Sequence, residues 1–313
     1  MELPQSTLTR YDEAARYLLL QTEGAFFDWL LPNRRGTLEF RNWGPTQLTL
    51  PNVRQRICDG IAFLGDRTRN GVPVAGLLEI QTTPDANMPG RLLLAGGLLW
   101  MTMKPSDHPG DRYELLAIVL NLTGVGNARF HHDFGDAGWL LHPVERNFCT
   151  LDAQEVMREV AAGLAPRQLL AFIPLMQGGD DSATLRQWRT VVEAEPDMQR
   201  RGDLMLAHVF AERVGRQAQW EEMMEGLTFI ESPMIGEMLN RERAVAEARG
   251  ATRGATNAKI ESLLVVLQRR FGPLPQDLHA ALLACQDTTA LDRSLVIALD
   301  AGSLPDFRAA VGL

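Results

Sequence analysis

Two strongly apolar segments, residues 54–64 and 74–82, constrain the fold of this chain more than any other feature of the sequence. The residues between them, 66–71, end in the Asn-Gly dipeptide that is typical of tight hairpin turns. We therefore expect two neighbouring antiparallel strands in the core of a sheet. Each strand also carries an acid, Asp59 in the first and Glu79 in the second. Because an unpaired buried carboxylate is costly, we expect each acid to meet a cation or a network of hydrogen bonds.

The two acids indicate a site for a divalent metal ion. Side chains alternate between the faces of a strand, so Glu79 and Gln81 point the same way. If the strands pair, Asp59 and Glu79 can approach one ion, and the backbone carbonyl of Ile80 is a natural further ligand. Mg²⁺, or Mn²⁺ in its place, prefers such oxygen donors. Gln81 could orient a water molecule but cannot deprotonate it. The same pattern fits a polar network that only stabilises the fold, because perturbed carboxylates occur in both settings.

The segments around the two strands predict an α/β fold with a mixed sheet. Apolar residues at helical spacing predict a helix over residues 10–31, with Thr9 as its cap. The other elements expected in this half are short strands at 38–40 and 47–50, a helix from Asp85 through 91–103, and a buried strand at 113–122.

From Leu151 onward the sequence is predominantly helical. Helices are expected at residues 152–163, 166–176, 182–193, 203–214, 220–229, 233–249, 258–271, 276–285 and 289–300. The segment 246–256 is rich in Ala, Gly, Arg and Thr and is expected to be a hinge. The predicted organisation is an α/β core at 1–150, a helical region packed on it at 151–250, and a small C-terminal helical domain at 257–313.

Composition favours a reduced, cytoplasmic location. The chain has 313 residues, of which 45% are hydrophobic and 22% charged, which is ordinary for a globular protein. No apolar run approaches the roughly 20 residues that a membrane span needs, so no membrane partner is expected. The three cysteines are widely spaced and odd in number, which argues against a disulfide framework or a zinc cluster.

The net charge of −8 argues against a nucleic-acid partner, but its distribution weakens that argument. Residues 1–104 contain 11 basic and 10 acidic side chains, so the negative charge lies in the remainder of the chain. The candidate acids therefore lie in the part of the chain that carries almost no net charge.

The pattern around the two strands resembles a known nuclease family. An Asp is followed after 19 residues by Glu-x-Gln, and then by the sequence TTPDANMPGRL. This order is similar to the core of the recombination-promoting nuclease (Rpn) family, the transposase-like members of the PD-(D/E)xK nuclease superfamily. The residues at the matching positions are Asp59, Glu79, Gln81, Asp85, Met88 and Arg91. The opening YDEAARYLL, the strand ELLAIVLNLTG and the C-terminal tail from residue 254 also resemble the family and its appended helical domain.

The resemblance implies a restriction-endonuclease-like mixed sheet flanked by helices, and Mg²⁺- or Mn²⁺-dependent cleavage of DNA. Asp59 and Glu79 would hold the metal, and Gln81 stands where lysine is usual. Arg91 is expected to contact Glu79 or a phosphate, or to form an ordinary salt bridge at the start of a helix. A homodimer is expected, because nucleases that cut both strands often act as dimers. The acid that the family carries on its first helix has three candidates, Asp12, Glu13 and Glu23, of which Asp12 matches the family's opening helix.

The alternative is a nuclease-fold protein that does not cleave and acts as a binding or regulatory module through its helical half. Other candidate sites are weaker. His131 and His132 would face opposite ways in a strand, so they are poorly suited to ligate one metal together with His142. Cys58 is expected to be a small buried residue rather than a nucleophile. The Gly-Val-Gly sequence at 124–126 lacks the remaining glycine of a dinucleotide-binding loop.

Overall fold

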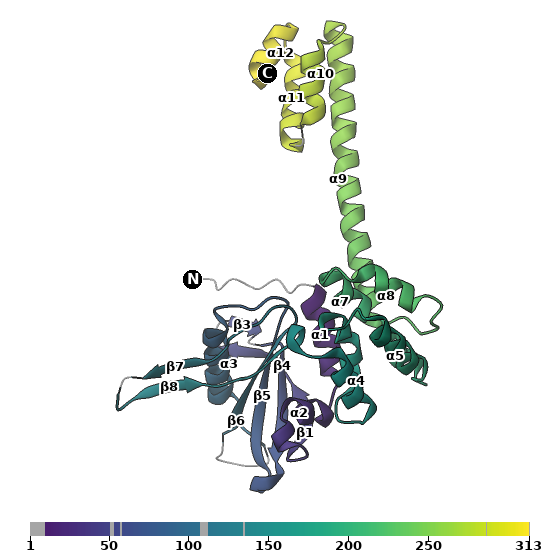
Figure 1. Cartoon of the computed structure of the whole chain (residues 1–313). Helices are drawn as coiled ribbons and strands as arrows, with labels where there is room; N and C mark the ends of the chain where they lie inside the picture. The colour runs from purple at the N-terminus through teal and green to yellow at the C-terminus, as the bar shows by residue number, and fades with distance from the viewer. Residues whose placement is uncertain are drawn as a thin grey trace. The chain divides into compact units, whose positions relative to one another are not determined.

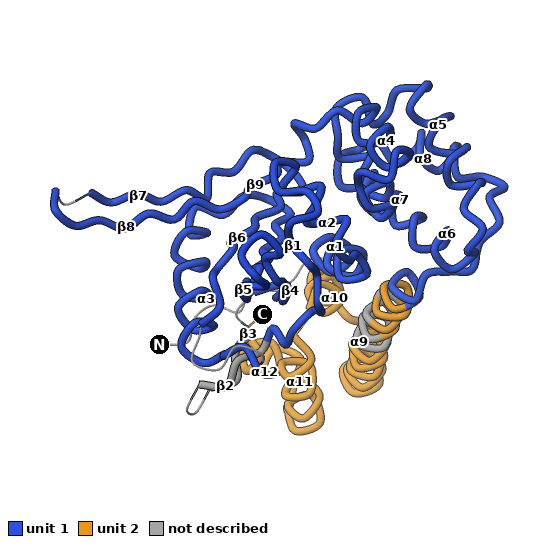
Figure 2. Tube along the Cα trace, turned by 90° about the horizontal axis from the view of Figure 1, so that it is seen from below, with its two compact units in different colours: residues 1–236 blue, residues 237–313 orange. Residues whose placement is uncertain are grey.

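The computed structural model describes residues 10–50, 53–56, 58–106, 112–133, 135–285 and 287–312. The chain divides into two compact units, Met1–Gly236 and Glu237–Leu313, which are described separately (Figure 2). The first unit contains a sheet and a group of helices, and the second is helical.

A five-stranded mixed sheet with the strand order β1-β4-β5-β6-β9 forms the centre of the first unit. β4 is antiparallel to β1 and to β5, whereas β6 is parallel to β5 and β9 is parallel to β6. β4 therefore runs against the other four strands. The strands are β1 (Leu38–Gly44), β4 (Gly60–Asp66), β5 (Val72–Gln81), β6 (Glu114–Asn121) and β9 (Val144–Asn147). This confirms the expected α/β class with a mixed sheet.

The predicted hairpin is present as β4 and β5, which pair from Gly60↔Leu78 to Asp66↔Val72. The turn reverses the chain through Asn70 and Gly71, which have φ of 53° and 76°. The expected first strand over 54–64 is wrong in its extent, because β3 (Val53–Arg56) pairs instead with β2 (Gln47–Leu50). β4 starts only at Gly60, so Asp59 precedes the strand rather than lying within it; Ile57 falls outside the described residues.

Helices cover both faces of the sheet (Figure 1). On one face, Ala95, Leu98 and Leu99 of α3 (Met88–Thr102) pack with Ile61, Ala75 and Leu77 of the sheet. The opposite face is covered by α1 (Arg10–Leu20) and α2 (Gly24–Leu30), and Phe27 of α2 lies close to Gly76 of β5. Each fully buried leucine contributes roughly 1.5–3 kcal/mol, so α3 is fixed strongly against the hairpin.

The single helix predicted over 10–31 is wrong, because the chain leaves the helix between α1 and α2. The backbone N–H and the hydroxyl of Thr22 both donate to the carbonyl of Leu19, at 3.0 and 2.6 Å, and this ends α1. The second helix starts at Gly24 and turns Phe26 and Phe27 into the core. Two short helices thus replace one long helix.

An antiparallel pair of short strands projects from the sheet domain, as Figures 1 and 2 both show. This arm consists of β7 (Phe130–Asp133) and β8 (Gly138–Leu141). Trp139 and Leu140 on the arm are 65% and 73% exposed. The sequence did not predict the arm, because its strands are short and lack a buried face.

The helical half of the first unit packs on α1. Tyr17 of α1 donates to Asp203 at 2.9 Å, and the hydroxyl of Ser232 donates to the same carboxylate at 2.7 Å. Burial and the bond to Asp203 raise the pKa of Tyr17. The elements are α4 (Ala153–Ala161), the 3₁₀ segment Arg167–Leu175, α5 (Ser182–Glu193), α6 (Met198–Leu204), α7 (Ala207–Arg213) and α8 (Gln217–Met224).

The second unit contains α9 (Pro233–Phe271) from Glu237 onward, with α10 (Gln276–Ala284), α11 (Thr288–Asp300) and α12 (Leu304–Val311). Leu263, Leu267, Leu278 and Phe307 form its core. The hinge expected at 246–256 is wrong at the level of secondary structure, because α9 is continuous through it. In the described part of the chain, no helix combines the length and the apolar character needed to cross a membrane.

Candidate functional site

The side chains singled out in the sequence meet at the carboxyl-terminal end of β5. Asp59 contacts Ile80, Asp12 contacts Thr82, Gln81 contacts Asp85 and Arg91 contacts Glu79. They come from α1, the start of β4, β5 and α3, so the fold brings four separate segments to one place. Asp59 and Glu79 thus lie on neighbouring segments, while the binding of one ion by both carboxylates stays a prediction.

Asp59 is held at the point where β4 begins. Its backbone N–H donates to the carbonyl of Leu78 at 2.9 Å, and Arg16 of α1 donates to its carbonyl at 2.8 Å. Its carboxylate accepts the backbone N–H of Ile80 at 2.7 Å and is almost fully buried. The regular β4–β5 register ends at the pair Gly60↔Leu78, and the bonds of Asp59 to Leu78 and Ile80 hold it beside the last residues of β5. The N–H and the carbonyl of a strand residue point to the same side, so the Ile80 carbonyl lies along the same edge as Asp59.

Glu79 is paired with a cation. Its side chain is fully buried, and Arg91 in the first turn of α3 donates to its Oε2 at 2.6 Å. Arg91 is 39% exposed and also lies 3.5 Å from a carboxylate oxygen of Asp85. The contact with Glu79 is one of the outcomes expected for Arg91. It explains how the buried charge is offset in the absence of a metal ion.

Asp12 reaches the same end of β5 from the opposite face of the sheet. It accepts the hydroxyl of Thr82, the residue directly after the strand, at 2.7 Å. Asp12 and Arg16 are one helical turn apart, so α1 contacts both the end of β5 and the backbone of Asp59. Glu23, a competing candidate, instead lines a cleft elsewhere in the domain. Asp12 is thus linked to the end of β5 by a hydrogen bond.

A row of amides at the ends of three parallel strands was missed by the sequence reasoning. Gln81 pairs in register with Asn121 of β6, and Asn121 pairs with Asn147 of β9. Asn121 donates to Glu145 at 2.8 Å and to Asn147 at 2.7 Å. The available signal was Asn121 itself, the one uncharged polar residue in the apolar strand ELLAIVLN.

Two atoms of this row are buried without a hydrogen-bond partner among the residues that the structure describes. They are Nε2 of Gln81, a donor, and Oδ1 of Asn121, an acceptor. The other amide atom of Gln81 is used, because Oε1 accepts the N–H of Asp85 at 2.7 Å. Paired residues on adjacent strands lie about 5 Å apart, so the unused donor and acceptor belong to neighbouring side chains. Such groups cost about 1–3 kcal/mol each and are candidates for contact with a water molecule or a ligand.

The residues at this site fit a hard divalent cation in their chemistry. Asp59, Glu79 and the Ile80 carbonyl offer oxygen donors, and Mg²⁺ usually takes one or two carboxylates and completes its coordination with water. Across the described ranges, no group of three or more His, Cys, Asp or Glu side chains is arranged to hold a metal ion. The oxygen donors that could hold a divalent cation here are thus the two carboxylates of Asp59 and Glu79 and the carbonyl of Ile80. Arg91 occupies one oxygen of Glu79 and would compete with the cation for it.

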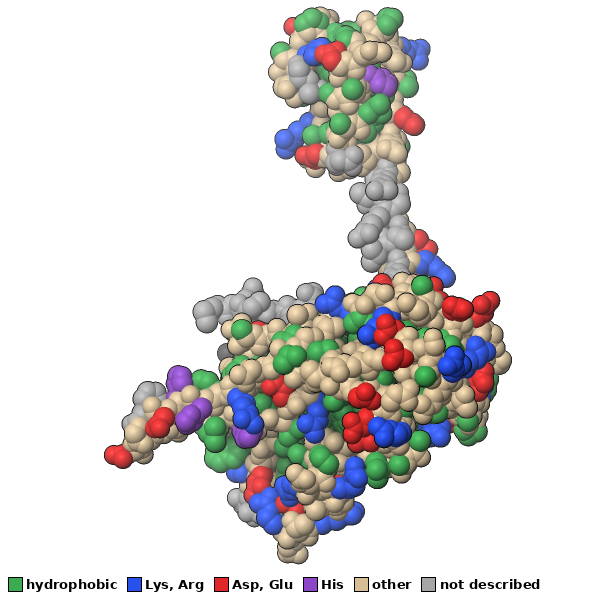
Figure 3. All heavy atoms as spheres, viewed as in Figure 1, with side chains coloured by type: hydrophobic (Ala, Val, Ile, Leu, Met, Phe, Trp, Pro, Cys, Tyr) green, Lys and Arg blue, Asp and Glu red, His purple; other side chains and the backbone are tan. Residues whose placement is uncertain are grey.

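The other candidates from the sequence do not form sites. His131 and His132 are exposed on successive positions of β7, and His142 contacts Arg129. Figure 3 shows histidines on the projecting arm. Cys58 is buried beside the sheet core, as expected, and its thiol lies 3.3 Å from the carbonyl of Gly60.

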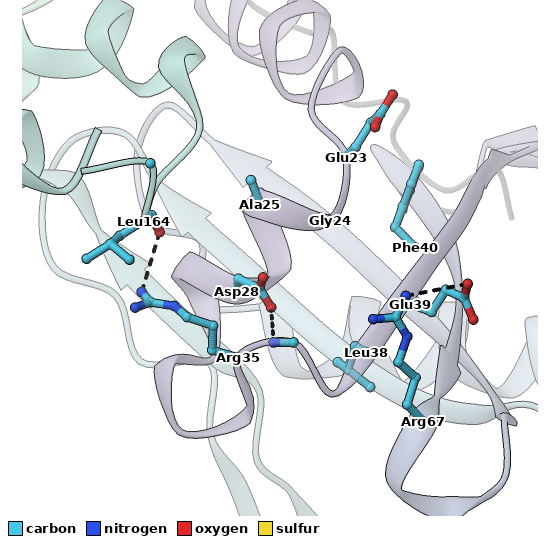
Figure 4. A pocket seen from close by; sticks show the side chains of 12 residues that line it. Glu23, Gly24, Ala25, Asp28, Arg35, Leu38, Glu39, Phe40, Arg67 and Leu164 are labelled. Carbon is cyan, nitrogen blue, oxygen red and sulfur yellow. Dashed lines mark hydrogen bonds and ion pairs between the residues drawn. The ribbon is translucent and has the colours of Figure 1, made fainter. Parts of the chain in front are cut away.

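A charged cleft lies at the other end of β4 (Figure 4). Arg67, directly after that strand, is 3.5 Å from Glu39, and Asp28 accepts the N–H of Gly36 at 2.7 Å. Arg35 donates to the carbonyl of Leu164 at 3.4 Å. Because Arg67 and the cleft lie at one end of β4 and Asp59 precedes the opposite end, the cleft is separate from the site at the end of β5.

Comparisons of the chain with protein-family models, with curated proteins and with solved structures each found no match. The function must therefore be argued from the site.

Proposed function

We propose that this chain is a metal-dependent endonuclease of the recombination-promoting type, which hydrolyses phosphodiester bonds in DNA. The observation that carries the proposal is the meeting of Asp59, Glu79 and Gln81 at the end of β5, on a mixed sheet with helices on both faces. Asp12 and Arg91 border the same place from two different helices. These are the residues that the resemblance to the PD-(D/E)xK superfamily marks.

In this proposal Asp59, Glu79 and the Ile80 carbonyl hold Mg²⁺ or Mn²⁺. A metal ion bound there would stabilise negative charge on the phosphoryl oxygens and lower the pKa of a bound water. Gln81 donates from Nε2, the buried amide nitrogen that has no partner among the described residues, and so orients the water or a phosphate oxygen. Asp12 holds the end of β5 through Thr82.

Gln81 stands where the superfamily usually has lysine, so an ammonium group is missing from the site. The guanidinium of Arg91, 2.6 Å from Glu79, supplies a cation in the immediate surroundings. Guanidinium groups bind phosphate oxygens through two parallel N–H donors. Arg91 is therefore the residue that would offset charge on the substrate in place of the lysine.

Nicking of supercoiled plasmid DNA in Mg²⁺ or Mn²⁺ tests the proposal. The wild type should cut, whereas Asp59→Asn and Glu79→Gln should not. Glu39→Gln is a matched control, because Glu39 is an exposed acid on β1 that pairs only at long distance with Arg67. Equal cutting by all four proteins would remove the assigned site, and no cutting by the wild type would remove the activity.

A second candidate is a nuclease-fold module that binds but does not cleave. The ion pair between Arg91 and Glu79 favours it, because a permanent pair would keep a metal ion away from the carboxylate. Its helical half, from Leu151 onward, would then be the interaction surface. Calorimetric titration separates the two, since the module should take up no Mg²⁺ or Mn²⁺ at millimolar concentration.

The proposed enzyme acts on DNA as a homodimer in the cytoplasm. Among the described residues, Cys58, Cys149 and Cys285 are free thiols, which suits a reducing compartment. Exposed apolar side chains on α3 and the arm offer surfaces for a second copy: Leu94, Trp100, Met101, Trp139 and Leu140. Light scattering over a range of protein concentrations tests the dimer.

A further inference from the structure

The pair formed by Glu79 and Arg91 is unequal in its exposure. The carboxylate of Glu79 is fully buried, whereas the guanidinium of Arg91 is 39% exposed. Arg91 is thus the member of the pair that borders solvent. A long side chain at the first turn of a helix can change its rotamer without moving the backbone, but a buried glutamate in the middle of a sheet cannot leave its place.

Arg91 has a second anionic partner within reach. One oxygen of Asp85 lies 3.5 Å from the guanidinium, which is too long for a strong bond, and Asp85 is itself 34% exposed. The other oxygen of Asp85 accepts the N–H of Asn87 at 2.8 Å, so its position is fixed by the turn that precedes α3. If Arg91 left Glu79, its charge would remain next to a carboxylate at the surface.

A divalent cation and the guanidinium cannot both occupy the same oxygen of Glu79. They carry charge of the same sign, and their repulsion in a partly buried site is stronger than in water. Binding of the cation to Glu79 therefore weakens the attraction that holds Arg91 on Oε2, and a displaced Arg91 would present its N–H groups to solvent at the edge of the site.

We propose that Arg91 is an exchangeable counter-ion. In the metal-free protein its guanidinium neutralises Glu79; when a divalent cation binds to Asp59 and Glu79, Arg91 turns toward Asp85 and takes a phosphodiester oxygen of the substrate. This inference rests on the proposed nuclease function and adds a prediction to it: the cation and the phosphodiester strengthen each other's binding through one side chain.

Mn²⁺ titration by calorimetry, together with thermal unfolding, tests the exchange without measuring cleavage. Arg91→Gln should bind Mn²⁺ about tenfold more tightly than the wild type, because the competing charge is gone. The metal-free variant should unfold at a lower temperature, since a buried carboxylate has lost its cation, and Mn²⁺ should raise that temperature more than it does in the wild type. Arg200→Gln is the matched control, because Arg200 is 69% exposed and lies 3.5 Å from Asp197 at the start of α6.

A second measurement uses the wild type alone and does not depend on the folding of a variant. Ca²⁺ should tighten the binding of a fluorescent DNA duplex about fivefold or more, as read by anisotropy, because it displaces Arg91 toward the phosphate. Equal or weaker Mn²⁺ binding in Arg91→Gln, or no effect of Ca²⁺ on duplex binding, overturns the exchange and leaves the nuclease proposal standing. No uptake of Mn²⁺ by any of the proteins at millimolar concentration overturns the proposed function itself.

Discussion

Asn121 and Gln81 lie side by side at the ends of β6 and β5, and both are buried on the face of the sheet that α3 covers. Asn121 donates to two acceptors on β9, Glu145 and Asn147, and these two residues in turn accept N–H groups of Ala128 and Gly126 in the loop that follows β6. A carboxamide is required here because both acceptors face its nitrogen. The amide row thus connects the candidate site to the edge of the sheet.

Asn121→Asp should lower the free energy of unfolding by about 3 kcal/mol at pH 7, because it places a buried carboxylate against Glu145 and removes the donor. The loss should shrink as the pH falls and the carboxylates take up protons. Urea unfolding at pH 7 and pH 5 measures both effects. Asn127→Asp, at an exposed position of the same loop, is the control and should change stability by less than about 0.5 kcal/mol. An Asn121→Asp protein as stable as the wild type would contradict the role of the row.

Two substitutions at Asp59 separate its structural part from its proposed metal-binding part. Asp59→Ala leaves the buried N–H of Ile80 without its acceptor and should cost about 1–3 kcal/mol. Asp59→Asn keeps an acceptor oxygen and should cost under about 1 kcal/mol, yet it should abolish Mn²⁺ uptake, because the charge is gone. Urea unfolding and calorimetry measure the two effects. Wild-type Mn²⁺ affinity in Asp59→Asn would mean that Asp59 only caps the strand.

The parts of the fold that the sequence predicted are those that depend on local patterns. The β4–β5 hairpin follows from two apolar runs and the Asn70–Gly71 turn, whose left-handed conformation is favoured by just these residues. The position of Asp59 before β4 could not be predicted, because the bend depends on a bond to Ile80 across the sheet. A pattern of apolar residues alone continues the strand through the bend.

The sequence analysis named Asp59, Glu79 and Gln81 as candidate site residues but missed Asn121 and Asn147, for a physical reason. An acid in an apolar strand is conspicuous because burying its charge is costly, whereas a single asparagine such as Asn121 is compatible with a turn or a strand end. Its partners Glu145 and Asn147 lie on β9, which becomes adjacent only after a long connection. The contact between Arg91 and Glu79 is one of the alternatives that the sequence analysis left open for Arg91, beside a phosphate and an ordinary salt bridge.

Asp66 is a residue through which the stability of the sheet should decrease at acidic pH. It is fully buried at the end of β4 and accepts bonds from Thr68, Arg69 and Arg34 at 2.6 to 3.0 Å. The bonds from Thr68 first, and then from the two guanidinium groups, hold the pKa of Asp66 well below its ordinary value despite burial. Because the pKa is lower in the folded state, its contribution is complete above the unfolded pKa of about 3.9 and is lost as the pH falls below it.

Asp66→Asn should therefore lower the free energy of unfolding by about 2–3 kcal/mol at pH 7 and flatten its decline below about pH 4. Urea unfolding from pH 7 to pH 3 measures the difference between the two proteins. Asp136→Asn, at an exposed position in the arm, is the control and should keep the wild-type profile. If the free energy of unfolding of Asp66→Asn declined below about pH 4 as steeply as that of the wild type, groups other than Asp66 would cause the loss of stability in acid.

Two glycines with opposite surroundings test the packing of the site. A Cβ on Gly126 would overlap the Asn121 amide and the Glu145 carboxylate, so Gly126→Ala should cost about 2 kcal/mol or more by displacing the amide row. Gly97 lies on the exposed side of α3 with nothing near its Cβ direction, so Gly97→Ala should stabilise the protein by about 0.5–1 kcal/mol through helix propensity alone. Urea midpoints of the two variants should thus move in opposite directions from the wild type. Because Gly126 is close to Asn121, Gly126→Ala should also reduce cleavage of DNA, whereas Gly97→Ala should not. If the urea midpoints of both variants moved in the same direction, the close contact of Gly126 with Asn121 and Glu145 would not constrain the loop.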